Sequence, residues 1–476
     1  MLPDFKGLRV TVMGLGLNQG GLGVSKWLLR QGARLTVTDL KDRRALKTSI
    51  DALEAFRKAL GRNARPVRYV LGRHRDEDFR DTGMIIRNPG VPRGSKYLEI
   101  ARQAGVPVES DMSIFFGLCT HPIIGVSGTK GKTTVTALIG AMLEAAFGRT
   151  LVAGNIRTSP LGSPAMTSKK AVPIVLELSS WQLEGLAHAK RSPDIAVLTN
   201  VLPDHLNRYD GMEEYAAAKE LIYAWQLPTD IAIVPLDNAY TRKMGARVRG
   251  ERFWASMKTV SDGQNGLYYR GKKAILRTQG IETVLFDVSD VRLPGEHNAW
   301  NALLAAGASY LRGAQPQAIR KALRAFKGVP HRLERVRDLR GVSYWNDTAA
   351  TMPEASIAAM ETIFGKKKGV LIAGGADKEL EFGAWAQAVK RRAKDVILFE
   401  GTATPKMAAA LSAAGVRVGE TVRSMREAMV HAARAAKKGE AVLLSPGCAS
   451  FGLFINEFDR GDQFRSEVRR LRRARF

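Results

Sequence analysis

The stretch "HPIIGVSGTKGKTTVTALIGAMLEAAF", residues 121–147, decides the fold class of this chain. Its beginning is a short apolar run that predicts a strand, and its end repeats apolar residues at helical spacing. Between them lies a glycine-rich loop that ends in Lys132 and Thr133. Such a loop turns backbone N–H groups toward a phosphate, and the start of the following helix adds positive potential. The stretch therefore predicts a nucleotide-phosphate site in an α/β domain.

The spacing of this loop departs from the usual phosphate-loop pattern, which has four residues between its two glycines. Val126 stands where the first of those glycines would be, and the loop itself offers Gly128. A plain turn with a surface lysine is the alternative interpretation. The strand before the loop and the amphipathic helix after it favour phosphate binding by Lys132, with Thr133 or Thr134 offering a hydroxyl to Mg²⁺.

Composition places the chain among globular proteins of several domains. It has 476 residues, too many for one hydrophobic core, and 45% of them are hydrophobic and 25% charged. No apolar run approaches the roughly 20 residues that span a bilayer, and no signal-like segment opens the sequence. The two cysteines, Cys119 and Cys448, favour a reducing compartment over a disulfide framework. We therefore expect a cytoplasmic protein that is not inserted in a membrane.

The formal net charge is +27, from 73 basic and 46 acidic residues. A nucleic-acid partner, a small and highly anionic substrate, or a basic proteome would each account for it. Basic residues are spread along the chain, and only the tail "RRLRRARF", residues 469–476, concentrates them, without a recognised nucleic-acid-binding motif. Solvated charged surfaces are therefore the favoured interpretation, and we expect no nucleic-acid partner.

Alternating strand and helix signals divide the chain into three α/β blocks, at residues 1–116, 117–328 and 329–476. The first contains "LRVTVMG", "ARLTVTDL" and "GMIIRNPGVP", a pattern of parallel strands joined by helices. The second carries the glycine loop, and the third repeats short apolar strands such as "GVLIAGG" and "AVLLSPG". We expect a Rossmann-like domain, a P-loop ATPase-like domain and a second Rossmann-like domain, with ligands at the carboxyl ends of the strands.

The loop "GLGLNQGGLG", residues 14–23, is a second candidate nucleotide site. It departs from the G-x-G-x-x-G dinucleotide pattern, because Gln19 stands where the third glycine should be. Asp39 ends the next predicted strand at about the right distance for a ribose contact. A nucleotide site and a tight turn both remain open at this loop.

Other polar residues of the central block could take part in phosphate chemistry. Glu177 ends the apolar strand "VPIVLEL", where a solitary carboxylate is costly to bury unless it is paired or bound to a metal such as Mg²⁺. The alternative for Glu177 is a strand-end residue that faces solvent. His205 could ligate a metal, although a single histidine is more often structural. Lys219 lies on a predicted helix and, taken alone, would be a surface lysine.

These stretches, together with several others, resemble the Mur ligases. The shared segments follow the family's order: "GVSGTKGKTT" (125–134), "LELSSWQLE" (176–184), "NVLPDHLNRY" (200–209), "AAAKELIY" (216–223), "LPGEHNAWNAL" (293–303), "GVPHRLE" (328–334), "NDTAATMPEA" (346–355), "GGADKEL" (374–380), "LSPGCASFGLF" (444–454) and "RGDQF" (460–464). The resemblance covers nearly the whole chain. Its C-terminal segments are most similar to the branch that adds D-glutamate to UDP-N-acetylmuramoyl-L-alanine with ATP.

The resemblance implies an ATP and metal site. The residues that would bind ATP are Gly128, Thr129, Lys130, Gly131, Lys132, Thr133, Thr134, Asn298, Asn301, Arg332 and Asp347. Two Mg²⁺ ions would be held by Thr133, Glu177, His205 and Lys219, the last as a carbamylated lysine. The residues that would be catalytic are Lys132, Glu177, His205 and Lys219.

The resemblance also implies sites for two further substrates. The UDP-linked sugar would be bound by Leu17, Asp39, Lys41, Gly90, Asn155, Ser179 and His205, and the amino acid by Thr351, Lys378, Ser450 and Phe454. Two positions depart from the family pattern, since Ala349 replaces a common lysine and Glu457 replaces an aromatic residue. The implied protein is a monomeric, ADP-forming ligase of peptidoglycan precursor synthesis.

Other functions fit parts of the sequence. Within the same class the chain could be a Mur ligase for a different amino acid, or a folylpolyglutamate-synthase-like enzyme, although the N-terminal block with "NPGVP" speaks against the folate enzyme. In a different class, the high charge could belong to a P-loop ATPase stimulated by nucleic acid. Phosphate release measured with the UDP-linked precursor and amino acids, or with nucleic acid, separates these functions.

Overall fold

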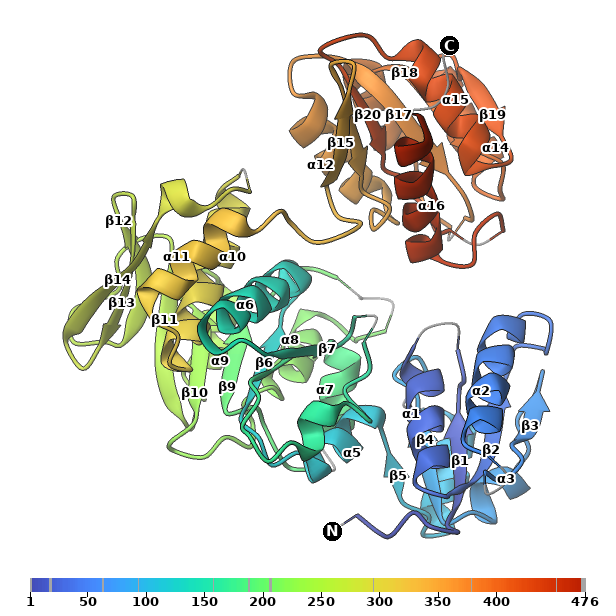
Figure 1. Ribbon diagram of the computed structural model, residues 1–476, viewed down its shortest axis with the longest axis vertical. Coiled ribbons are helices and arrows are strands. Elements are labelled where there is room, and N and C mark those ends of the chain that lie inside the picture. Colours follow the sequence, from blue (N-terminus) through green and yellow to red (C-terminus); the bar gives the residue numbers. More distant parts are fainter. Residues whose placement is uncertain are drawn as a thin grey trace. The chain divides into compact units, whose positions relative to one another are not determined.

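The computed structural model describes residues 2–16, 19–61, 64–92, 94–156, 158–186, 189–204, 208–293, 295–377, 379–450 and 452–471. Leu17, His205 and Lys378, which the sequence analysis assigned to binding sites, lie outside these residues. The chain divides into two compact units, Met1–Phe326 (unit 1) and Lys327–Phe476 (unit 2). Unit 1 holds a five-stranded and a nine-stranded sheet, and unit 2 holds a six-stranded sheet (Figure 1).

The five-stranded sheet is parallel and has the strand order β3-β2-β1-β4-β5. Its strands and helices are β1 Arg9–Met13, α1 Gln19–Arg30, β2 Arg34–Asp39, α2 Lys47–Ala59, β3 Arg68–Leu71, α3 Glu77–Arg80, β4 Met84–Arg87, α4 Lys96–Gln103 and β5 Val108–Glu109. One face is apolar, and Val12 and Val37 of this face are buried in one cluster with Leu28 of α1 and Leu53 of α2. The opposite face is covered only in part, because its smaller apolar cluster takes in Met13, Ile85 and Phe79 of α3.

The nine-stranded sheet has the order β14-β13-β12-β11-β10-β9-β6-β8-β7. Its strands are β6 Ile123–Ser127, β7 Leu151–Gly154, β8 Ile174–Glu177, β9 Ile195–Leu198, β10 Ile231–Pro235, β11 Glu251–Ser256, β12 Gly266–Arg270, β13 Lys273–Thr278 and β14 Ile281–Asp287. The helices around it are α5 Asp111–Leu118, α6 Lys132–Phe147, α7 Ser180–Leu186, α8 Met212–Glu220, α9 Ala239–Gly245, α10 Glu296–Leu311 and α11 Pro316–Ala325. Strands β6, β8 and β9 are buried and almost wholly apolar, as expected for parallel strands covered on both faces.

Unit 2 carries the sheet β15-β16-β20-β17-β18-β19, in which only the edge pair β15–β16 is antiparallel. Its elements are β15 Glu334–Leu339, β16 Val342–Asn346, α12 Pro353–Phe364, β17 Gly369–Gly374, α13 Gly383–Arg392, β18 Ala393–Phe399, α14 Thr404–Ala413, β19 Glu420–Val422, α15 Met425–Ala435, β20 Ala441–Leu444 and α16 Glu457–Arg470. Two apolar clusters cover its two faces, one with α12 to α14 and the other with α15 and α16.

The predicted fold class, three α/β domains built on mainly parallel sheets, is confirmed, since each predicted block contributes one sheet. The boundaries near residues 116 and 328 stay predictions. The antiparallel extension β12-β13-β14 was not foreseen. Its strands follow one another through short turns with Gly271 and Gly280 at positive φ, a local pattern that resembles any surface hairpin.

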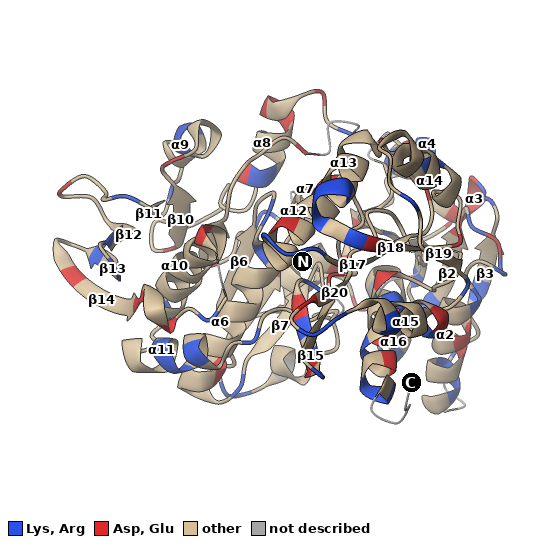
Figure 2. Cartoon of the chain, turned by 90° about the horizontal axis from the view of Figure 1, so that it is seen from above, with Lys and Arg blue, Asp and Glu red and all other residues tan. Residues whose placement is uncertain are grey.

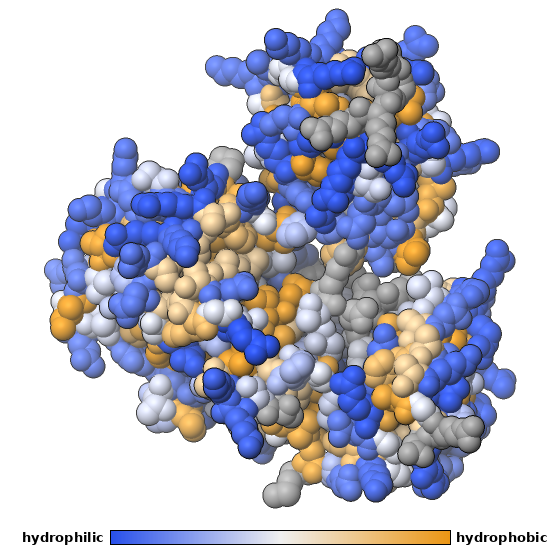
Figure 3. All heavy atoms as spheres, viewed as in Figure 1, coloured by the Kyte–Doolittle hydropathy of each residue, from blue (hydrophilic) through white to orange (hydrophobic). Residues whose placement is uncertain are grey.

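Charged residues are distributed over the surface of both units. Figure 2 shows Lys and Arg on helices and strands throughout the chain, among them elements of each sheet. The face of the molecule in Figure 3 is mainly hydrophilic, with small apolar areas between charged side chains. In the part of the chain that the structure describes, no helix is long and apolar enough to cross a membrane.

Candidate active site

The glycine loop connects β6 to α6 and has glycine where the backbone requires it. Gly128 and Gly131 have φ values of +142° and +88°, which L side chains rarely adopt. A Cβ atom added at Gly128 would lie 1.9 Å from Thr199 Oγ1, and one added at Gly131 would lie 2.5 Å from Asn301 Oδ1. Val126 is a fully buried residue of β6, so it belongs to the strand and not to the loop. The loop therefore begins at Gly128.

The segment after β9 fixes the backbone of this loop. Asn200 Oδ1 accepts from the Lys130 N–H at 2.8 Å, and the Asn200 carbonyl accepts from the Thr129 N–H at 2.9 Å. Thr199 Oγ1 donates to the Lys130 carbonyl at 2.6 Å. Because these hydrogen bonds tie the backbone of the loop to the segment after β9, the loop has a defined shape without a ligand.

Lys132 is the first residue of α6, and its ammonium group lies against the loop. Its Nζ donates to the carbonyl oxygens of Gly128 and Thr129, each at 3.0 Å. Phosphate oxygens would form stronger, charge-assisted hydrogen bonds with this ammonium than neutral carbonyls do. The amino end of α6 adds its positive potential at the same point. The loop, the lysine and the helix start together form a site suited to an oligophosphate.

Lys219 of α8 reaches the same carbonyl from the other side. Its side chain is 1% exposed, and its Nζ donates to the Gly128 carbonyl at 2.8 Å and lies 4.4 Å from the ring centroid of Tyr215. The interpretation of Lys219 as a surface lysine is therefore wrong. Burial, and after it the charge of Lys132, lowers the pKa of Lys219 to about 6. At neutral pH this side chain is thus a neutral, nucleophilic amine.

Glu177, the last residue of β8, is 2% exposed, so the interpretation that it faces solvent is wrong. It is the register partner of Val126 on β6, beside the strand that leads into the glycine loop. Its Oε1 accepts from Asn155 Nδ2 at 2.9 Å, whereas its Oε2 is buried without a hydrogen-bond partner. A buried carboxylate oxygen without a partner fits a hard cation such as Mg²⁺. Within the described ranges, no three His, Cys, Asp or Glu side chains are grouped as a metal site.

The other predicted residues of the central domain lie close to the loop in sequence or in space. Asn301 of α10 is 5% exposed and lies against Gly131, and Asn298 precedes it by one helical turn. Thr133 is the second residue of α6 and is half-buried. Ser179 follows β8, and its N–H donates to Gln182 Oε1 at 3.1 Å at the start of α7.

The carboxylate of Asp39 organises the loop after β1. It is 8% exposed; Oδ2 accepts from the Gly16 N–H at 3.1 Å, and Oδ1 accepts from the Lys41 N–H at 2.9 Å. Asp39 and Lys41 are thus brought together at the carboxyl end of β2. Each carboxylate oxygen keeps a lone pair for a ligand hydroxyl group.

Asn88, which the sequence analysis did not single out, links two of the loops expected to bind the UDP-linked substrate. Its Nδ2 donates to the Gly14 carbonyl at 3.1 Å, and its Oδ1 accepts from the N–H of Gly90 at 3.3 Å. A side chain at Gly14 would meet Asn88 Cβ at 3.1 Å. The only sequence signal is the "NPG" turn, in which an asparagine before Pro-Gly is too common to indicate a specific role.

Asp347, in unit 2, is a buried carboxyl group directly after β16. It is 5% exposed; Oδ1 accepts from the Leu333 N–H at 3.1 Å, and Oδ2 accepts from Ser445 Oγ at 3.0 Å. Burial raises the pKa of Asp347 to about 7, although its hydrogen bonds and the nearby charge of Arg332 act in the opposite direction. The segment that carries Arg332 is strained, since its neighbours His331 and Leu333 have φ values of +69° and +42°.

The raised pKa of Asp347 predicts a pH-dependent stability of unit 2. Between pH 4 and pH 7 the unfolded chain loses this proton and the folded chain keeps it, so folding stability falls as pH rises. Relative to Asp347→Asn, the wild type should lose up to about 1.4 kcal/mol per pH unit in this window and nothing further above it. Hydrogen exchange of the β17 and β20 amides, compared between the two proteins at each pH, measures this difference. A difference that does not change with pH would contradict the assignment.

Arg460 of α16 is a functional candidate that the sequence analysis missed. Its side chain is 0% exposed, and its guanidinium donates to Thr348 Oγ1 at 3.0 Å and to the Thr348 carbonyl at 3.1 Å. Longer hydrogen bonds reach the carbonyls of Gly374, Cys448 and Ala449, at 3.4 to 3.5 Å. It thereby joins the segments that follow β16, β17 and β20. Among the described residues no carboxylate lies within 4 Å of this arginine, and burial lowers its pKa to about 10.

The predicted amino-acid residues of unit 2 differ in their surroundings. Thr351 is half-buried before α12, and Ser450 is 2% exposed, directly after the Ala449 that Arg460 contacts. Phe454 is 7% exposed and packs edge-on against Phe399, with ring centroids 5.0 Å apart. Phe454 is therefore part of the core of unit 2.

Family models and curated relatives match this chain over nearly its whole length. Residues 8–110 match the Mur ligase MurD-like N-terminal domain, residues 126–309 the Mur ligase middle domain, and residues 331–448 the Mur ligase glutamate ligase domain. A UDP-N-acetylmuramoylalanine–D-glutamate ligase of Roseiflexus sp. strain RS-1 is 46% identical over 471 residues, which are 97% of this chain and 98% of the relative. The enzyme of that name from Symbiobacterium thermophilum is 38% identical over 97% of this chain and 98% of its own length.

Solved structures show a similar fold over nearly the whole chain. The UDP-N-acetylmuramate–alanine ligase MurC of Thermotoga maritima aligns with a TM-score of 0.59 at 18% identity, over 98% of this chain and 100% of that one. A murein peptide ligase of Psychrobacter arcticus aligns with a TM-score of 0.54 at 17% identity, over 99% of this chain and 100% of that one. At these identities the structures support the fold alone. The full-length relatives and the matched domains show that the chain belongs to the Mur ligase family.

Proposed function

We propose that this chain is an ATP-dependent ligase that joins D-glutamate to UDP-N-acetylmuramoyl-L-alanine and forms ADP and phosphate. Full-length similarity to ligases of that name supports the substrates. The observation that carries the chemistry is the pair of lysines, Lys132 and Lys219, whose amines meet at the carbonyl of Gly128 in the phosphate loop. One amine is suited to bind phosphate as a cation, and the other is neutral and buried.

In the first step an oxygen of the substrate carboxylate attacks the γ-phosphorus of ATP, and the bond to the β-phosphate oxygen breaks. The product is an acyl phosphate, and ADP carries away the bonding electrons. Both reactants are anions, so the reaction needs positive charge placed before they meet. Lys132, the loop N–H groups and the start of α6 would provide it.

In the second step the amine of D-glutamate attacks the acyl carbon. The carbon–oxygen bond to phosphate then breaks, phosphate leaves with the electron pair, and the amine nitrogen loses a proton to form the amide. Asn155, which donates to Glu177 Oε1, would orient the UDP-linked substrate. Thr351 and Ser450 of unit 2 would hold the incoming dicarboxylate by hydroxyl hydrogen bonds.

Mg²⁺ would be held by Glu177, Thr133, His205 and a modified Lys219, and it would supply further neutralisation of phosphate charge when bound. Support comes from the buried Glu177 Oε2, which has no hydrogen-bond partner in its present surroundings. The hydroxyl of Thr133 is an oxygen ligand of the kind that Mg²⁺ prefers, and His205 is assigned to the set by the family resemblance.

We also propose that Lys219 is carbamylated by carbon dioxide. Only a neutral amine attacks carbon dioxide, and the pKa of Lys219, lowered to about 6, leaves it neutral at pH 7 and above. The amine nitrogen would form a bond to the carbon and lose a proton, which yields a carboxylate-like group. This modification would turn a costly buried lysine into an anion beside Lys132, whose charge it would balance.

Arg460 is expected to be a positioning residue for the D-glutamate site. It holds the segments before Thr351 and Ser450 through backbone carbonyls, and a lysine at this position could not replace its fork of donors. For Arg460→Lys we expect the KM for D-glutamate to rise about tenfold, with a smaller change in kcat and in the KM for ATP. Arg469→Lys, an exposed position on the same helix, is the matched control. An equal rise in both KM values would contradict a local positioning role.

The assay that tests the function is phosphate release with ATP, UDP-N-acetylmuramoyl-L-alanine and a panel of amino acids. We expect release only with the UDP-linked precursor and, among the amino acids, with D-glutamate. A preference for another amino acid would make the chain a different Mur ligase. Release stimulated by DNA or RNA and independent of the precursor would instead support the nucleic-acid-dependent ATPase.

We propose that the enzyme works in the cytoplasm, as a monomer. The two free thiols, Cys119 and Cys448, are both buried, which suits a reducing compartment. ATP and D-glutamate are the co-substrates with which such an enzyme would supply precursors for the cell wall. The monomeric state stays a prediction.

A further inference from the structure

One face of the five-stranded sheet is left open near the amino ends of its strands. Arg9 and Arg34 are register partners on β1 and β2, and Thr36, two residues after Arg34, is the register partner of Arg68 on β3. Because side chains alternate along a strand, these residues all point to the same face. Parallel sheets are normally covered on both faces, so an open face lined with charged residues is unusual.

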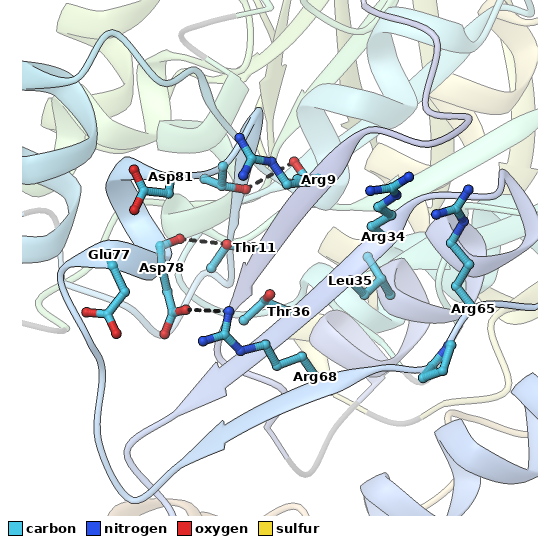
Figure 4. A pocket seen from close by; sticks show the side chains of 12 residues that line it. Arg9, Thr11, Arg34, Leu35, Thr36, Arg65, Arg68, Glu77, Asp78 and Asp81 are labelled. Atoms are coloured by element: carbon cyan, nitrogen blue, oxygen red, sulfur yellow. Dashed lines mark hydrogen bonds and ion pairs between the residues drawn. The ribbon is translucent and has the colours of Figure 1, made fainter.

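This open face forms a pocket of about 450 Å³ (Figure 4). The volume lies within the range of small-molecule sites in proteins, roughly 300–1,000 Å³. Figure 4 shows the guanidinium groups of Arg34 and Arg65 at one side of the pocket and the carboxylates of Glu77 and Asp81 at the other. The pocket therefore has a basic end and an acidic end.

The basic end carries charge that its surroundings do not neutralise. Within the described residues, no carboxylate lies within the 4 Å of an ion pair from Arg9, Arg34 or Arg65. Asp78, on the acidic side of the pocket, is engaged by Arg75 at 2.7 Å, with Arg68 at 3.7 Å.

Like charges placed directly opposite each other on neighbouring strands destabilise a sheet. The register pair of Arg9 and Arg34 is such a case, since both side chains leave the same face of adjacent strands. A bound anion between them would remove this repulsion. Guanidinium groups are also the side chains best shaped to bind phosphate oxygens in pairs.

The geometry points to a binding site for a small phosphate ester that carries hydroxyl or amino groups at its other end. The phosphate is held by Arg34 and Arg65, and Arg9, the register partner of Arg34, lies between them and the acidic end. The hydroxyl or amino groups donate to the carboxylates of Glu77 and Asp81 across the pocket. A ligand with a phosphate at one end and hydroxyl or amino groups at the other matches the separation of charge in the pocket. A plain polyanion would be repelled by the carboxylates at the acidic end.

This site is separate from the one proposed for the UDP-linked substrate. Arg34 begins β2 and Asp39 ends it, so the two sites lie at opposite ends of the strands of this sheet. At about 3.3 Å per residue, the strand separates their backbones by roughly 17 Å. A ligand can therefore bind in the pocket whether or not the active site is occupied, and both sites can be filled at the same time.

Ribose 5-phosphate is a suitable probe, titrated calorimetrically into the full chain saturated with Mg²⁺-ADP and UDP. We expect one binding event per chain, and no binding of ribose, which lacks the phosphate. Arg34→Gln and Arg65→Gln should each weaken binding about tenfold or more, because each removes a charge-assisted contact. Lys58→Gln removes an exposed charge from α2, on the other face of this sheet, and should leave binding unchanged.

The control is the thermal unfolding midpoint of each protein. Equal midpoints for the variants and the wild type show that a loss of binding is not caused by a loss of folding. No binding of ribose 5-phosphate to the wild type would overturn the proposal, as would binding that both arginine variants retain. If an RNA oligonucleotide bound in its place, with an affinity that Arg34→Gln and Arg65→Gln reduced, the pocket would be part of a nucleic-acid surface and the proposal would be wrong.

Discussion

Replacing Lys132 by alanine is expected to lower the rate of ADP formation by at least about 10²–10³-fold, with the fold retained. The substitution removes the one ammonium group that lies on the phosphate loop at the start of α6, where it donates to Gly128 and Thr129. Of the loop groups, only neutral N–H groups would then face the charge that develops on the γ-phosphate. Because Lys132 is only partly buried and contacts carbonyls of its own loop, its loss should cost little stability.

The measurement is ADP release in the complete reaction, with circular dichroism and thermal unfolding as controls for the fold. Lys130→Ala is a matched control, since Lys130 belongs to the same loop but its Nζ pairs with Asp204 at 3.1 Å, away from the loop carbonyls. Its effect should be much smaller than that of Lys132→Ala. ADP release at the wild-type rate from Lys132→Ala would refute the phosphate-binding role of this lysine.

Replacing Lys219 by alanine is expected to lower turnover to a similar extent, and short carboxylates should restore part of it. The alanine leaves a cavity beside the Gly128 carbonyl, next to the ring of Tyr215. Formate or acetate in that cavity would replace the negative group that we assign to the carbamylated lysine. Because the added carboxylate replaces the modification, the rescue should not depend on bicarbonate.

Lys219→Met is the matched control for this rescue. Methionine fills the cavity without providing charge, so added carboxylates should not restore its activity. The measurement is ADP release as a function of formate and acetate concentration in both variants. An absence of rescue in Lys219→Ala, together with an unmodified lysine in an experimental wild-type structure, would remove the proposed metal-binding role.

The glycine loop of the active site was predictable from sequence, because residues that are neighbours in the chain determine its strand–loop–helix pattern. The loop from Gly128 to Lys132 is bounded by an apolar strand and an amphipathic helix, and both are present. Residues distant in sequence exclude side chains at Gly128 and Gly131, because Thr199 and Asn301 occupy the space that a Cβ atom would need. The glycines indicated the backbone conformation of the loop from sequence. The close packing of other residues against them is seen only in the folded structure.

The environments of single polar residues were not predictable in the same way. Lys219 lies on a helix with weak amphipathic character, and only the packing of α8 against the loop buries it. Arg460 occurs in a C-terminal helix rich in charged residues, where an arginine is expected to face solvent. Its burial depends on the carbonyls of Thr348 and Ala449, more than ten positions away in sequence, which no local pattern reveals.

The open face of the first sheet shows a related limit. The sequence correctly indicated parallel strands, which predict helices on both faces. Arg9 and Arg34 each begin a strand, and the sequence alone indicates only that they are polar residues at strand ends. Only the register between β1 and β2 brings them together.

The central claim is that a substrate carboxylate is phosphorylated by ATP before the amine attacks it. The most direct test is ligation with UDP-N-acetylmuramoyl-L-alanine labelled with ¹⁸O in both oxygens of its carboxyl group. An acyl phosphate predicts that each phosphate released contains one ¹⁸O atom, and that the amide keeps the other. Ligation that releases unlabelled phosphate, with the lost ¹⁸O atom found in water, would contradict the account.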